Sequence, residues 1–244
     1  MSEETIVWIS GATEGLGSGL ARTVPWPGAR VINLSRRPHP ELETVVFDLA
    51  RPETWDAVGE SFRRELEGFS GKRAVFIHNA VLRSQTAFVG EIDRAAYMAE
   101  QMANAVAPQV LGDMFLGAVK PGYESGLVLI SSSAARVPVE GHASYCAAKA
   151  AVEMWVRTVR RELKRRGRET WLVAVRPGFV DSPTTRYQAT VDPRDYPVGA
   201  SMAQQFETGQ GVMSPDEAGA GIWAMLPPTG ADSILMQGEM VSAR

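Results

Sequence analysis

The chain has 244 residues, of which 45% are hydrophobic and 22% charged, and its formal net charge is −3. This composition is typical of a globular protein with a sizeable core, and the slight negative charge argues against a surface that binds nucleic acid. With one cysteine, no secretion-signal pattern at the start and no apolar run of about 18 residues, we expect a cytoplasmic protein without an internal disulfide or a membrane partner.

Short apolar segments alternate with amphipathic segments along the chain. Strands are predicted at 5–10, 30–35, 44–48, 73–78, 126–131, 171–176 and, more weakly, 232–237, and helices near 15–24, 52–66, 91–119, 143–166 and 214–226. Strands that are apolar nearly throughout suit a sheet covered on both faces. The alternation therefore predicts an α/β fold, a Rossmann-type doubly wound parallel sheet of about seven strands in a single domain spanning 1–244.

The segment 183–213 interrupts this alternation. It contains Pro, Gly, Tyr, Met and Phe residues without strand periodicity. A segment of this length and irregularity is typical of a functional lid or of disorder. Because it follows the strand at 171–176, on the side where such sheets bind ligands, we predict a substrate lid near 183–213.

The first strand leads into the sequence SGATEGLGSG at 10–19. Gly11, Gly15 and Gly17 have the spacing G-x-x-x-G-x-G, and glycines between a strand and a helix let the backbone approach a pyrophosphate at the positive helix end. Glycines also serve ordinary tight turns, so the position after the first strand carries more weight than the spacing. No Lys-Ser/Thr pair follows the last glycine, which excludes a P-loop.

The second strand ends in NLSRRP, where NAD-binding units usually place an acidic residue. Here Ser35 is followed by Arg36 and Arg37, and two guanidiniums suit the 2′-phosphate of NADP. The alternative is a pair of solvated surface arginines. Glu14, in the glycine loop, conflicts with NADP because it would place negative charge near that phosphate. Asp48 is either an acceptor for the adenine amino group or a simple turn residue.

Tyr145 and Lys149 are four residues apart in SYCAAK and share one face of a predicted helix. The lysine cation is expected to lower the pKa of the phenol, so that Tyr145 exchanges a proton with a carbonyl or alcohol oxygen. This pair alone is common in ordinary helices. Ser132, in LISSSAA at a strand end thirteen residues earlier, makes the pair significant, because it would lie at the ligand-binding edge of the sheet.

With these motifs in this order, the chain resembles a short-chain dehydrogenase/reductase of the compact single-domain subtype, from the first strand through RPGFVDS. The resemblance, which extends to reductases of the sepiapterin and benzil type, implies a Ser132–Tyr145–Lys149–Asn104 tetrad. In it Tyr145 is the general acid/base, Lys149 lowers the Tyr145 pKa and binds the nicotinamide ribose, Ser132 orients the substrate oxygen, and Asn104 completes the tetrad through a bound water.

The resemblance also implies a cofactor site, with NADP expected and NAD as the alternative. The implied cofactor-binding residues are Ser10, Gly11, Thr13, Gly15, Leu16, Gly17, Ser35, Arg36, Arg37, Asp48, Leu49, Asn79, Ala80, Tyr145, Lys149, Pro177, Gly178, Val180 and Ser182. The helices at 91–119 and 143–166 resemble those of the family's dimer contact, so a homodimer or homotetramer is expected.

Four positions bear on this resemblance. Pro108, four residues after Asn104, cannot donate an N–H to the Asn104 carbonyl, which leaves that carbonyl free for a water relay or simply kinks the helix. Val81 replaces the glycine of the family's N-N-A-G, here HNAV, and is expected to alter the local loop. His78, in the same motif, is expected to be a packed strand-end residue. Cys146 points away from Tyr145 and is expected to be a small buried residue.

His39 and His142 lie in loop-like sequence without metal-ligand spacing, so no metal site is expected. The sequence favours an NADPH-dependent reduction of a ketone or aldehyde, or the reverse oxidation. A partly apolar substrate is expected from lid residues Tyr187, Tyr196, Met202 and Phe206. One alternative is a catalytically silent NAD(P)-binding regulator of the same fold. Another, a sugar-nucleotide epimerase, usually has a longer chain and a G-x-x-G-x-x-G loop.

Overall fold

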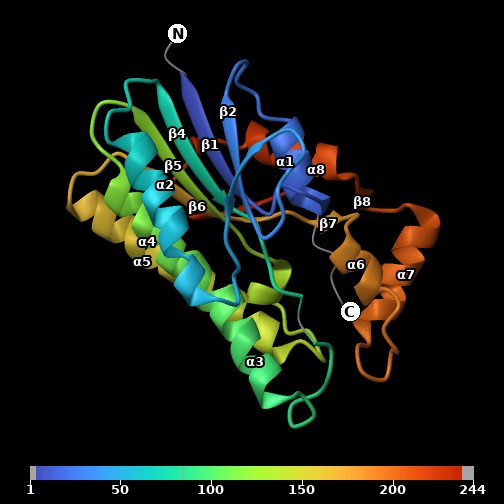
Figure 1. Ribbon diagram of the computed structural model, residues 1–244. Helices are drawn as coiled ribbons and strands as arrows, with labels where there is room; N and C mark the ends of the chain where they lie inside the picture. Colours follow the sequence, from blue (N-terminus) through green and yellow to red (C-terminus); the bar gives the residue numbers. More distant parts are fainter. Residues whose placement is uncertain (1–3, 84, 238–244) are drawn as a thin grey trace.

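The structure is a computed structural model that describes residues 4–83 and 85–237 (Figure 1). Within these residues seven strands form one sheet in the order β3-β2-β1-β4-β5-β6-β9, and every pairing is parallel. The strands are β1 (Thr5–Ser10), β2 (Arg30–Ser35), β3 (Glu43–Val46), β4 (Arg73–His78), β5 (Glu124–Ile130), β6 (Trp171–Arg176) and β9 (Ile234–Met236). This confirms the predicted doubly wound parallel sheet. The first three and last seven residues of the expected 1–244 domain lie outside the described part of the chain.

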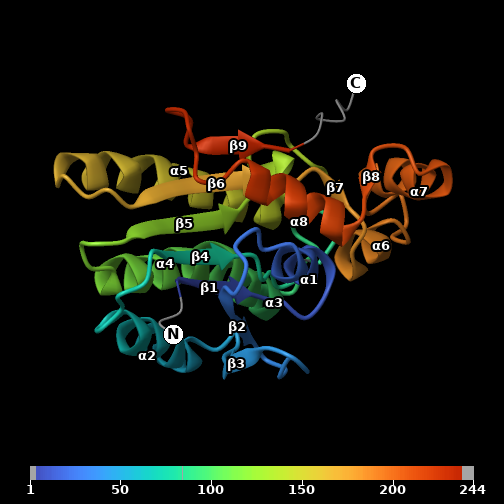
Figure 2. The ribbon, with the colours of Figure 1, turned by 90° about the horizontal axis from the view of Figure 1, so that it is seen from above.

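Helices cover both faces of the sheet (Figures 1 and 2). One face carries α1 (Gly15–Arg22) and α8 (Pro215–Ala224), and the other carries α2 (Asp56–Leu66), α4 (Ala107–Ala118) and α5 (Ala143–Arg165). Because β1 contributes Trp8 to one hydrophobic cluster and Val7 to the other, alternate residues of an apolar strand fill both cores.

Glycine permits the close packing of α1 against α8. A Cβ atom on Gly19 would lie 1.8 Å from the Pro215 carbonyl oxygen, and one on Gly219 would lie 2.7 Å from the backbone nitrogen of Leu20. No side chain fits at either position, so the two helices approach backbone to backbone. This contact fixes the N-terminal helix, whose first turn belongs to the glycine loop.

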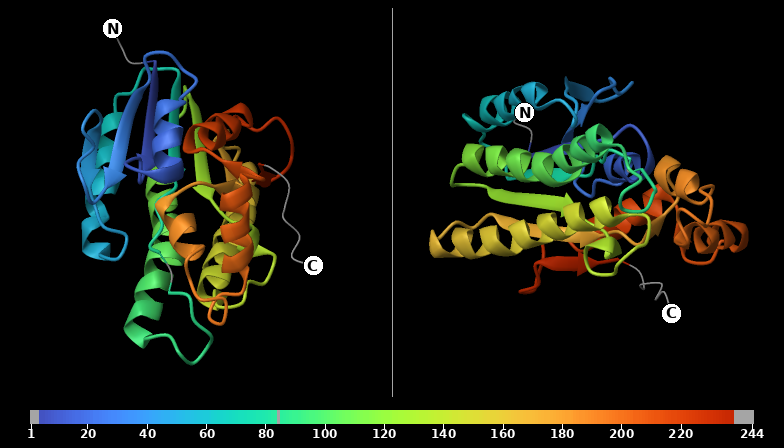
Figure 3. Two further views of the ribbon diagram at one scale, coloured as in Figure 1. Left: turned by 90° about the vertical axis from the view of Figure 1, so that its right-hand side faces the viewer. Right: turned by 90° about the horizontal axis from the view of Figure 1, so that it is seen from below.

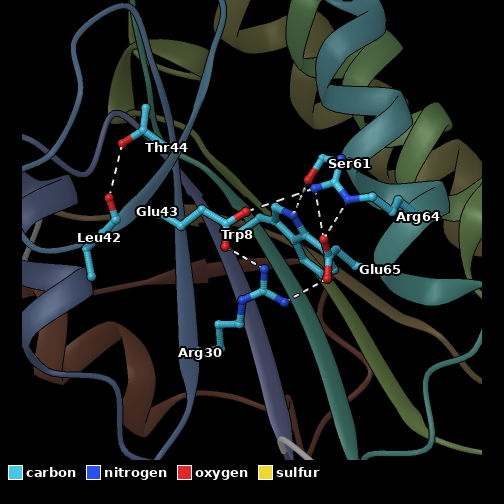
Figure 4. Close-up of polar contacts among 8 residues, drawn as sticks. All are labelled: Trp8, Arg30, Leu42, Glu43, Thr44, Ser61, Arg64 and Glu65. Carbon is cyan, nitrogen blue, oxygen red and sulfur yellow. Dashed lines mark hydrogen bonds and ion pairs between the residues drawn. The ribbon is translucent and has the colours of Figure 1, made fainter.

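Polar contacts join strands β1, β2 and β3 to α2 (Figure 4). Arg30 on β2 pairs with Glu65 on α2 at 2.7 Å and with Glu43 on β3. Trp8 donates its indole N–H to the Ser61 hydroxyl across 3.2 Å, and both residues are buried. The indole can therefore lie in the core without an unpaired donor.

The strand order reverses at β1: β2 and β3 follow on one side of it, and β4 and the later strands on the other. In doubly wound sheets ligands bind at this switch point, beyond the carboxyl ends of the strands. The strands point toward the side of the molecule where α6 (Pro183–Gln188) and α7 (Val198–Thr208) lie (Figure 2). The topology therefore places the candidate site between the strand ends and these two helices.

The 183–213 segment is not irregular, which corrects the sequence-based expectation. It contains α6 and α7 and ends in β8 (Val212–Met213), which pairs with β7 (Phe179–Val180) in a small separate sheet. The two helices lie together at one side of the main body (Figure 3). Helix α6 begins with a capping box at Ser182 followed by Pro183. It has only six residues, too short for a periodic apolar pattern.

Other boundaries also differ from the prediction. The helix expected at 91–119 is α3 (Arg94–Gln101), a π-helical turn (Met102–Val106) and α4, and the helix expected from 52 begins as a short 3₁₀ turn (Pro52–Thr54) before α2. The strand expected at 44–48 ends at Val46. Pro108 explains the π-helical turn, because it has no N–H to continue the α-helical hydrogen bonding.

Candidate active site

A cavity of about 1030 Å³ lies at the carboxyl edge of the sheet. Its wall includes most of the predicted site residues: Gly11, Thr13, Gly15, Leu16, Ser35, Arg36, Arg37, Asp48, Leu49, Asn79, Ala80, Ser132, Tyr145, Lys149, Pro177, Gly178, Val180 and Ser182. Three predicted site residues, Ser10, Gly17 and Asn104, do not line it. Each lies behind the wall and contacts residues that do.

The glycine loop has the geometry that its sequence predicts. Gly11 and Gly15 have φ angles of +73° and +55°, which L side chains rarely adopt. A Cβ atom on Gly17 would lie 1.9 Å from the Gly11 carbonyl oxygen and 2.6 Å from Nδ2 of Asn79. Gly17 therefore acts by letting the first turn of α1 pack under the loop, while Gly11 and Gly15 face the cavity.

Ser10 and His78 connect the glycine loop to the end of β4. The Ser10 hydroxyl accepts the backbone N–H groups of Asn79 and Ala80, each at 2.9 Å, and lies 3.1 Å from Nδ1 of His78. Its own hydrogen is then directed to Nδ1, so the neutral His78 ring carries its proton on Nε2. Burial and the nearby Lys149 cation lower the pKa of His78 to about 3. His78 is a packed strand-end residue, as expected.

Asn33 is a buried residue of the site that the sequence did not reveal. Its Oδ1 accepts the Ala12 N–H at 3.1 Å, and its Nδ2 donates to Oγ1 of Thr44 at 3.1 Å and to the Arg37 carbonyl at 3.4 Å. The side chain thus ties the glycine loop to the turn after β2. The available signal was an amide in the middle of an apolar strand, where a buried polar group needs partners.

The arginines after β2 both line the cavity, but their surroundings differ. Nη2 of Arg37 lies 3.2 Å from Oε2 of Glu14, and both side chains are exposed. Among the described residues Arg36 has no ion pair or side-chain hydrogen bond, and its side chain is exposed. Glu14 therefore offsets the charge of Arg37, while the Arg36 guanidinium stays available to a ligand phosphate. Asp48 lines the cavity and also accepts the Ala50 N–H at 2.9 Å.

Ser132, Tyr145 and Lys149 converge at the end of β5. The Ser132 hydroxyl accepts the Ala134 N–H at 3.2 Å and acts on the neighbouring Tyr145 phenol to lower its pKa. The Lys149 ammonium donates to the Ile130 carbonyl at 2.8 Å and lies 5.6 Å from the centroid of the Tyr145 ring. Helix α5 thus carries the phenol and the ammonium on one face, as the four-residue spacing predicts.

The direction of the Tyr145 pKa shift is opposite to the expectation. Burial raises the pKa of Tyr145 to about 12, although the Ser132 hydroxyl acts to lower it. Burial also lowers the pKa of Lys149 to about 8, so the lysine itself loses charge readily. The expected lowering of the phenol pKa by Lys149 is therefore wrong for this geometry, because burial dominates the shift and the lysine is directed toward a backbone carbonyl.

Asn104 is buried behind the cavity in the π-helical turn. Its side chain makes a reciprocal pair with the backbone of Leu82, accepting from the N–H and donating to the C=O, each at 2.8 Å. The side chain is thereby committed to fixing the loop after β4. A relay role for Asn104 would have to use its backbone carbonyl. Pro108 has no N–H to donate to this carbonyl, and the relay role stays a prediction.

A buried ion pair lies beside the site and was missed from the sequence. Arg176 donates from Nε to Oε1 of Glu153 at 2.7 Å and from Nη2 to Oε2 at 2.8 Å, and Ser131 donates to Oε1 at 2.8 Å. Arg176 lines the cavity and immediately precedes Pro177. A signal was present, since Glu153 lies one turn after Lys149 and Arg176 ends an apolar strand.

Two further residues differ from their expected surroundings. Val81 lines the cavity with an ordinary backbone conformation, since no described non-glycine residue has a positive φ angle. Its replacement of glycine therefore leaves the loop unstrained. Cys146 is partly exposed rather than buried.

The four apolar lid residues divide into two pairs. Tyr196 and Met202 line the cavity and are buried. Tyr187 instead lies on the surface under the Arg83 guanidinium, and Phe206 packs against Phe179. Two of the four therefore face the expected ligand space.

Neither a metal site nor a membrane span is found in the parts of the chain that the structure describes. Those residues contain no group of three or more His, Cys, Asp or Glu side chains placed to hold a metal ion. None of the helices in the described ranges is long and apolar enough to cross a membrane.

Comparison with known proteins identifies the family. The short chain dehydrogenase family matches residues 5–192. Benzil reductase ((S)-benzoin forming) of Bacillus subtilis (strain 168) is 26% identical over 214 residues, covering 85% of this chain and 87% of that protein. L-xylulose reductase of Homo sapiens is 27% identical over 167 residues, covering 64% of this chain and 65% of that protein.

Solved structures agree in fold. A short-chain dehydrogenase from Burkholderia cenocepacia J2315 in complex with NADP superimposes with a TM-score of 0.74 at 24% identity, covering 98% of this chain and 91% of that one. A short-chain dehydrogenase/reductase from Saccharomyces cerevisiae gives a TM-score of 0.79 at 19% identity, with 95% of both chains covered. The family match extends over most of the sequence, from the glycine loop to beyond the Tyr145–Lys149 pair. The chain belongs to the short-chain dehydrogenase/reductase family of NAD(P)-dependent oxidoreductases.

Proposed function

We propose that the protein is an NADPH-dependent reductase that converts a partly apolar ketone or aldehyde to an alcohol, with Tyr145 as the proton donor. The observation that carries the proposal is the convergence of Ser132, Tyr145 and Lys149 in a cavity that continues to the glycine loop. The phenol and the hydroxyl would hold the substrate oxygen between them.

The raised pKa of Tyr145 is consistent with its proposed role as a proton donor. With a pKa of about 12 the phenol keeps its proton at neutral pH, as a general acid must. Lys149, with a pKa lowered to about 8, still carries a proton at pH 7 and lies next to the phenol. In the proposed mechanism Lys149 restores the Tyr145 proton, and a water on the Asn104 carbonyl connects Lys149 to solvent.

The residues present fit a bound NADP. The backbone of Gly11 and Gly15 would hold the pyrophosphate at the start of α1, Arg36 the 2′-phosphate, and Lys149 the nicotinamide ribose. When bound, the nicotinamide supplies the hydride that the protein lacks. The NADP complex of the Burkholderia neighbour and the reductase names of the relatives support this assignment.

Helices α6 and α7 would act as a substrate lid. Tyr196, in the loop between these helices, and Met202, on α7, present apolar surface to the cavity. This surface supports a partly apolar substrate, because burying apolar groups against it removes them from water.

We also propose that the protein assembles as a homodimer or homotetramer through the face of α3, α4 and α5. Apolar side chains are exposed on α3 and α5, among them Met98 at 65% and Met154 at 58%. Exposed apolar side chains on neighbouring helices are typical of a protein–protein interface.

Replacement of Tyr145 by Phe tests the proposed function. NADPH oxidation would be followed with a panel of ketones and aldehydes, and NADPH binding by fluorescence. Tyr145→Phe is expected to lower kcat by about 10²- to 10⁴-fold while NADPH still binds. Tyr123→Phe, which removes a phenol that caps a loop before β5, is the matched control and should retain activity.

Two results would contradict the proposal in different ways. Retained activity in Tyr145→Phe would exclude that residue as the acid. Wild-type protein that binds NADPH tightly but reduces no carbonyl in the panel would favour a catalytically silent NAD(P)-binding regulator.

A further inference from the structure

A carboxylate is buried where three elements of the proposed active site meet. Glu153 on α5 accepts hydrogen bonds from Ser131 at the end of β5 and from Arg176 at the end of β6, at distances between 2.7 and 2.8 Å. All three side chains are buried. The proposed mechanism gives none of them a chemical step, yet each belongs to an element that carries residues of the site.

Helix α5 is joined to the end of β5 at two consecutive residues. The Lys149 ammonium donates to the Ile130 carbonyl at 2.8 Å. One helical turn later, Glu153 accepts the Ser131 hydroxyl at 2.8 Å. Ser132 is the next residue along the chain. The second contact therefore fixes Ser132 relative to the helix that carries Lys149.

The same carboxylate also fixes the loop that follows β6. Arg176 contacts it through Nε and Nη2, a bidentate arrangement that restrains the guanidinium in direction as well as in distance. Pro177 and Gly178 come next and line the cavity. Gly178 has a φ angle of +77°, and a Cβ atom there would lie 2.8 Å from the Gln237 carbonyl oxygen, so the loop has little room to shift.

This loop lies at the nicotinamide end of the proposed cofactor site. Pro177 and Gly178 are among the expected cofactor-binding residues, and the carboxylate that anchors them is one helical turn from Lys149, which would hold the nicotinamide ribose. Glu153 therefore joins the wall beside the nicotinamide to the strand end that carries Ser132.

Stability alone does not explain an ion pair at this position. Two charges lose their hydration when they are buried, and an apolar pair of similar volume is often equally stable or more stable. An apolar pair would have no directional contact with Ser131, however, and would let α5, β5 and β6 shift relative to one another. A hydrogen-bonded network that is fully satisfied holds its members in one arrangement.

We propose that Glu153 and Arg176 are positioning residues, which hold the nicotinamide at hydride-transfer distance from a carbonyl bound by Ser132 and Tyr145. This inference rests on the proposed function. Neither residue exchanges a proton or a hydride with the substrate. A misplacement of about 1 Å between reacting groups can lower a rate about 10²-fold, so the loss of the network should appear in the hydride-transfer step.

The test compares two variants whose stability and activity should change in opposite order. Glu153→Leu/Arg176→Met removes the hydrogen bonds but forms an apolar pair, so its Tm should stay near that of the wild type. Glu153→Gln keeps Oε1, which accepts both Ser131 and Nε of Arg176, but leaves the guanidinium without a counter-charge, so its Tm should be lower. Arg157→Gln is the matched control, because Arg157 also faces Glu153 but is half exposed.

Hydride transfer would be measured in single-turnover experiments with NADPH and with NADPH deuterated at the transferred position. The carbonyl probe is 4-nitrobenzaldehyde, or the best substrate of the panel if the wild type does not reduce this aldehyde. Single-turnover kinetics separate the chemical step from product release, and NADPH fluorescence gives Kd, so that every rate is taken at saturating cofactor. All variants are measured well below the lowest Tm among them.

We expect the double variant to transfer hydride about 10- to 100-fold more slowly than the wild type, with a deuterium isotope effect at least as large. Glu153→Gln should be faster than the double variant although its Tm is lower, and Arg157→Gln should match the wild type in rate and in Tm.

A double variant that transfers hydride at the wild-type rate would overturn the inference and leave the reductase function intact. Rates that follow Tm across the variants would also overturn it, because the pair would then be only structural. Failure of the wild type to reduce any carbonyl of the panel would instead refute the proposed function, and this inference with it.

Discussion

The buried Glu153–Arg176 pair gives a quantitative prediction about stability. The two side chains are 2% and 7% exposed, and Glu153 Oε1 and Oε2 accept three short hydrogen bonds from Arg176 and Ser131. Glu153→Leu would leave the guanidinium buried without its carboxylate, and breaking such a pair typically costs about 3–5 kcal/mol. In a chain of 244 residues, 1 kcal/mol corresponds to about 2–4 °C in Tm. We therefore expect Tm to fall by about 6–20 °C.

The assay is urea denaturation followed by tryptophan fluorescence, together with thermal denaturation followed by circular dichroism. Arg157→Gln is the matched control, because Arg157 also faces Glu153 but at 3.5 Å and with 48% exposure. Because the Arg157 guanidinium is half exposed, losing this contact is expected to cost less than about 1 kcal/mol. The double variant Glu153→Leu/Arg176→Met removes both charges and should recover most of the loss, since an apolar pair of similar volume is tolerated.

The double variant decides whether the reasoning is correct. If Glu153→Leu and Arg176→Met destabilise the protein additively, the two groups do not act as a pair. A loss below about 1 kcal/mol in Glu153→Leu would show that water reaches the guanidinium. Because Arg176 precedes Pro177–Gly178, the single variant is also expected to raise KM for NADPH more than the Arg157 control does.

Three further predictions concern the cofactor, acid stability and assembly. Arg36→Gln should raise KM for NADPH about tenfold or more relative to KM for NADH, through the loss of a charge-assisted hydrogen bond. Arg37→Gln should raise it less, because Glu14 already pairs with Arg37. An unchanged ratio of the two KM values in both variants would mean that neither arginine binds the 2′-phosphate. Burial lowers the pKa values of His78 and His142 from 6.5 to about 3 and about 4, so below pH 6.5 the unfolded chain binds protons that the folded chain does not. As the pH falls below 6.5, the free energy of unfolding should therefore decrease by up to about 1.4 kcal/mol per pH unit for each histidine. Urea denaturation between pH 7 and 5 measures this decrease, and replacing both histidines by glutamine should flatten the pH dependence. Light scattering should give a dimeric or tetrameric mass for the wild type and a smaller one for Met154→Lys, which places a charge on the exposed face of α5; a wild-type monomer of 26.5 kDa would contradict the proposed assembly.

The glycine loop is held in place by neutral hydrogen bonds as well as by charge. Asn33 joins the glycine loop to the arginine turn, and Ser10 joins the same loop to the end of β4 through His78. These groups are buried and pair with backbone atoms, so their loss would leave polar atoms unsatisfied. The cofactor loop is thereby held by the sheet itself.

Local patterns in the sequence were sufficient for the fold and for most of the site. Strands that bury both faces must be apolar throughout, so β1, β4 and β6 stand out without any knowledge of their partners. The glycine spacing is also a local pattern, confined to one turn, and the Tyr145–Lys149 pair is confined to one helix. Their geometry follows from backbone conformation alone, and the structure keeps it.

Packing between distant segments decided the rest. His142 meets Tyr196 from the lid, Glu153 meets Arg176 from the next strand, and no local pattern encodes either contact. The pKa of Tyr145 likewise depends on how much water the surrounding elements exclude, which reversed the expectation drawn from the nearby lysine. The sequence by itself determined which groups could do chemistry, because residue type and short spacing specify them. Only the tertiary structure decided their protonation and their partners, because burial and long-range contacts exist only in the folded chain.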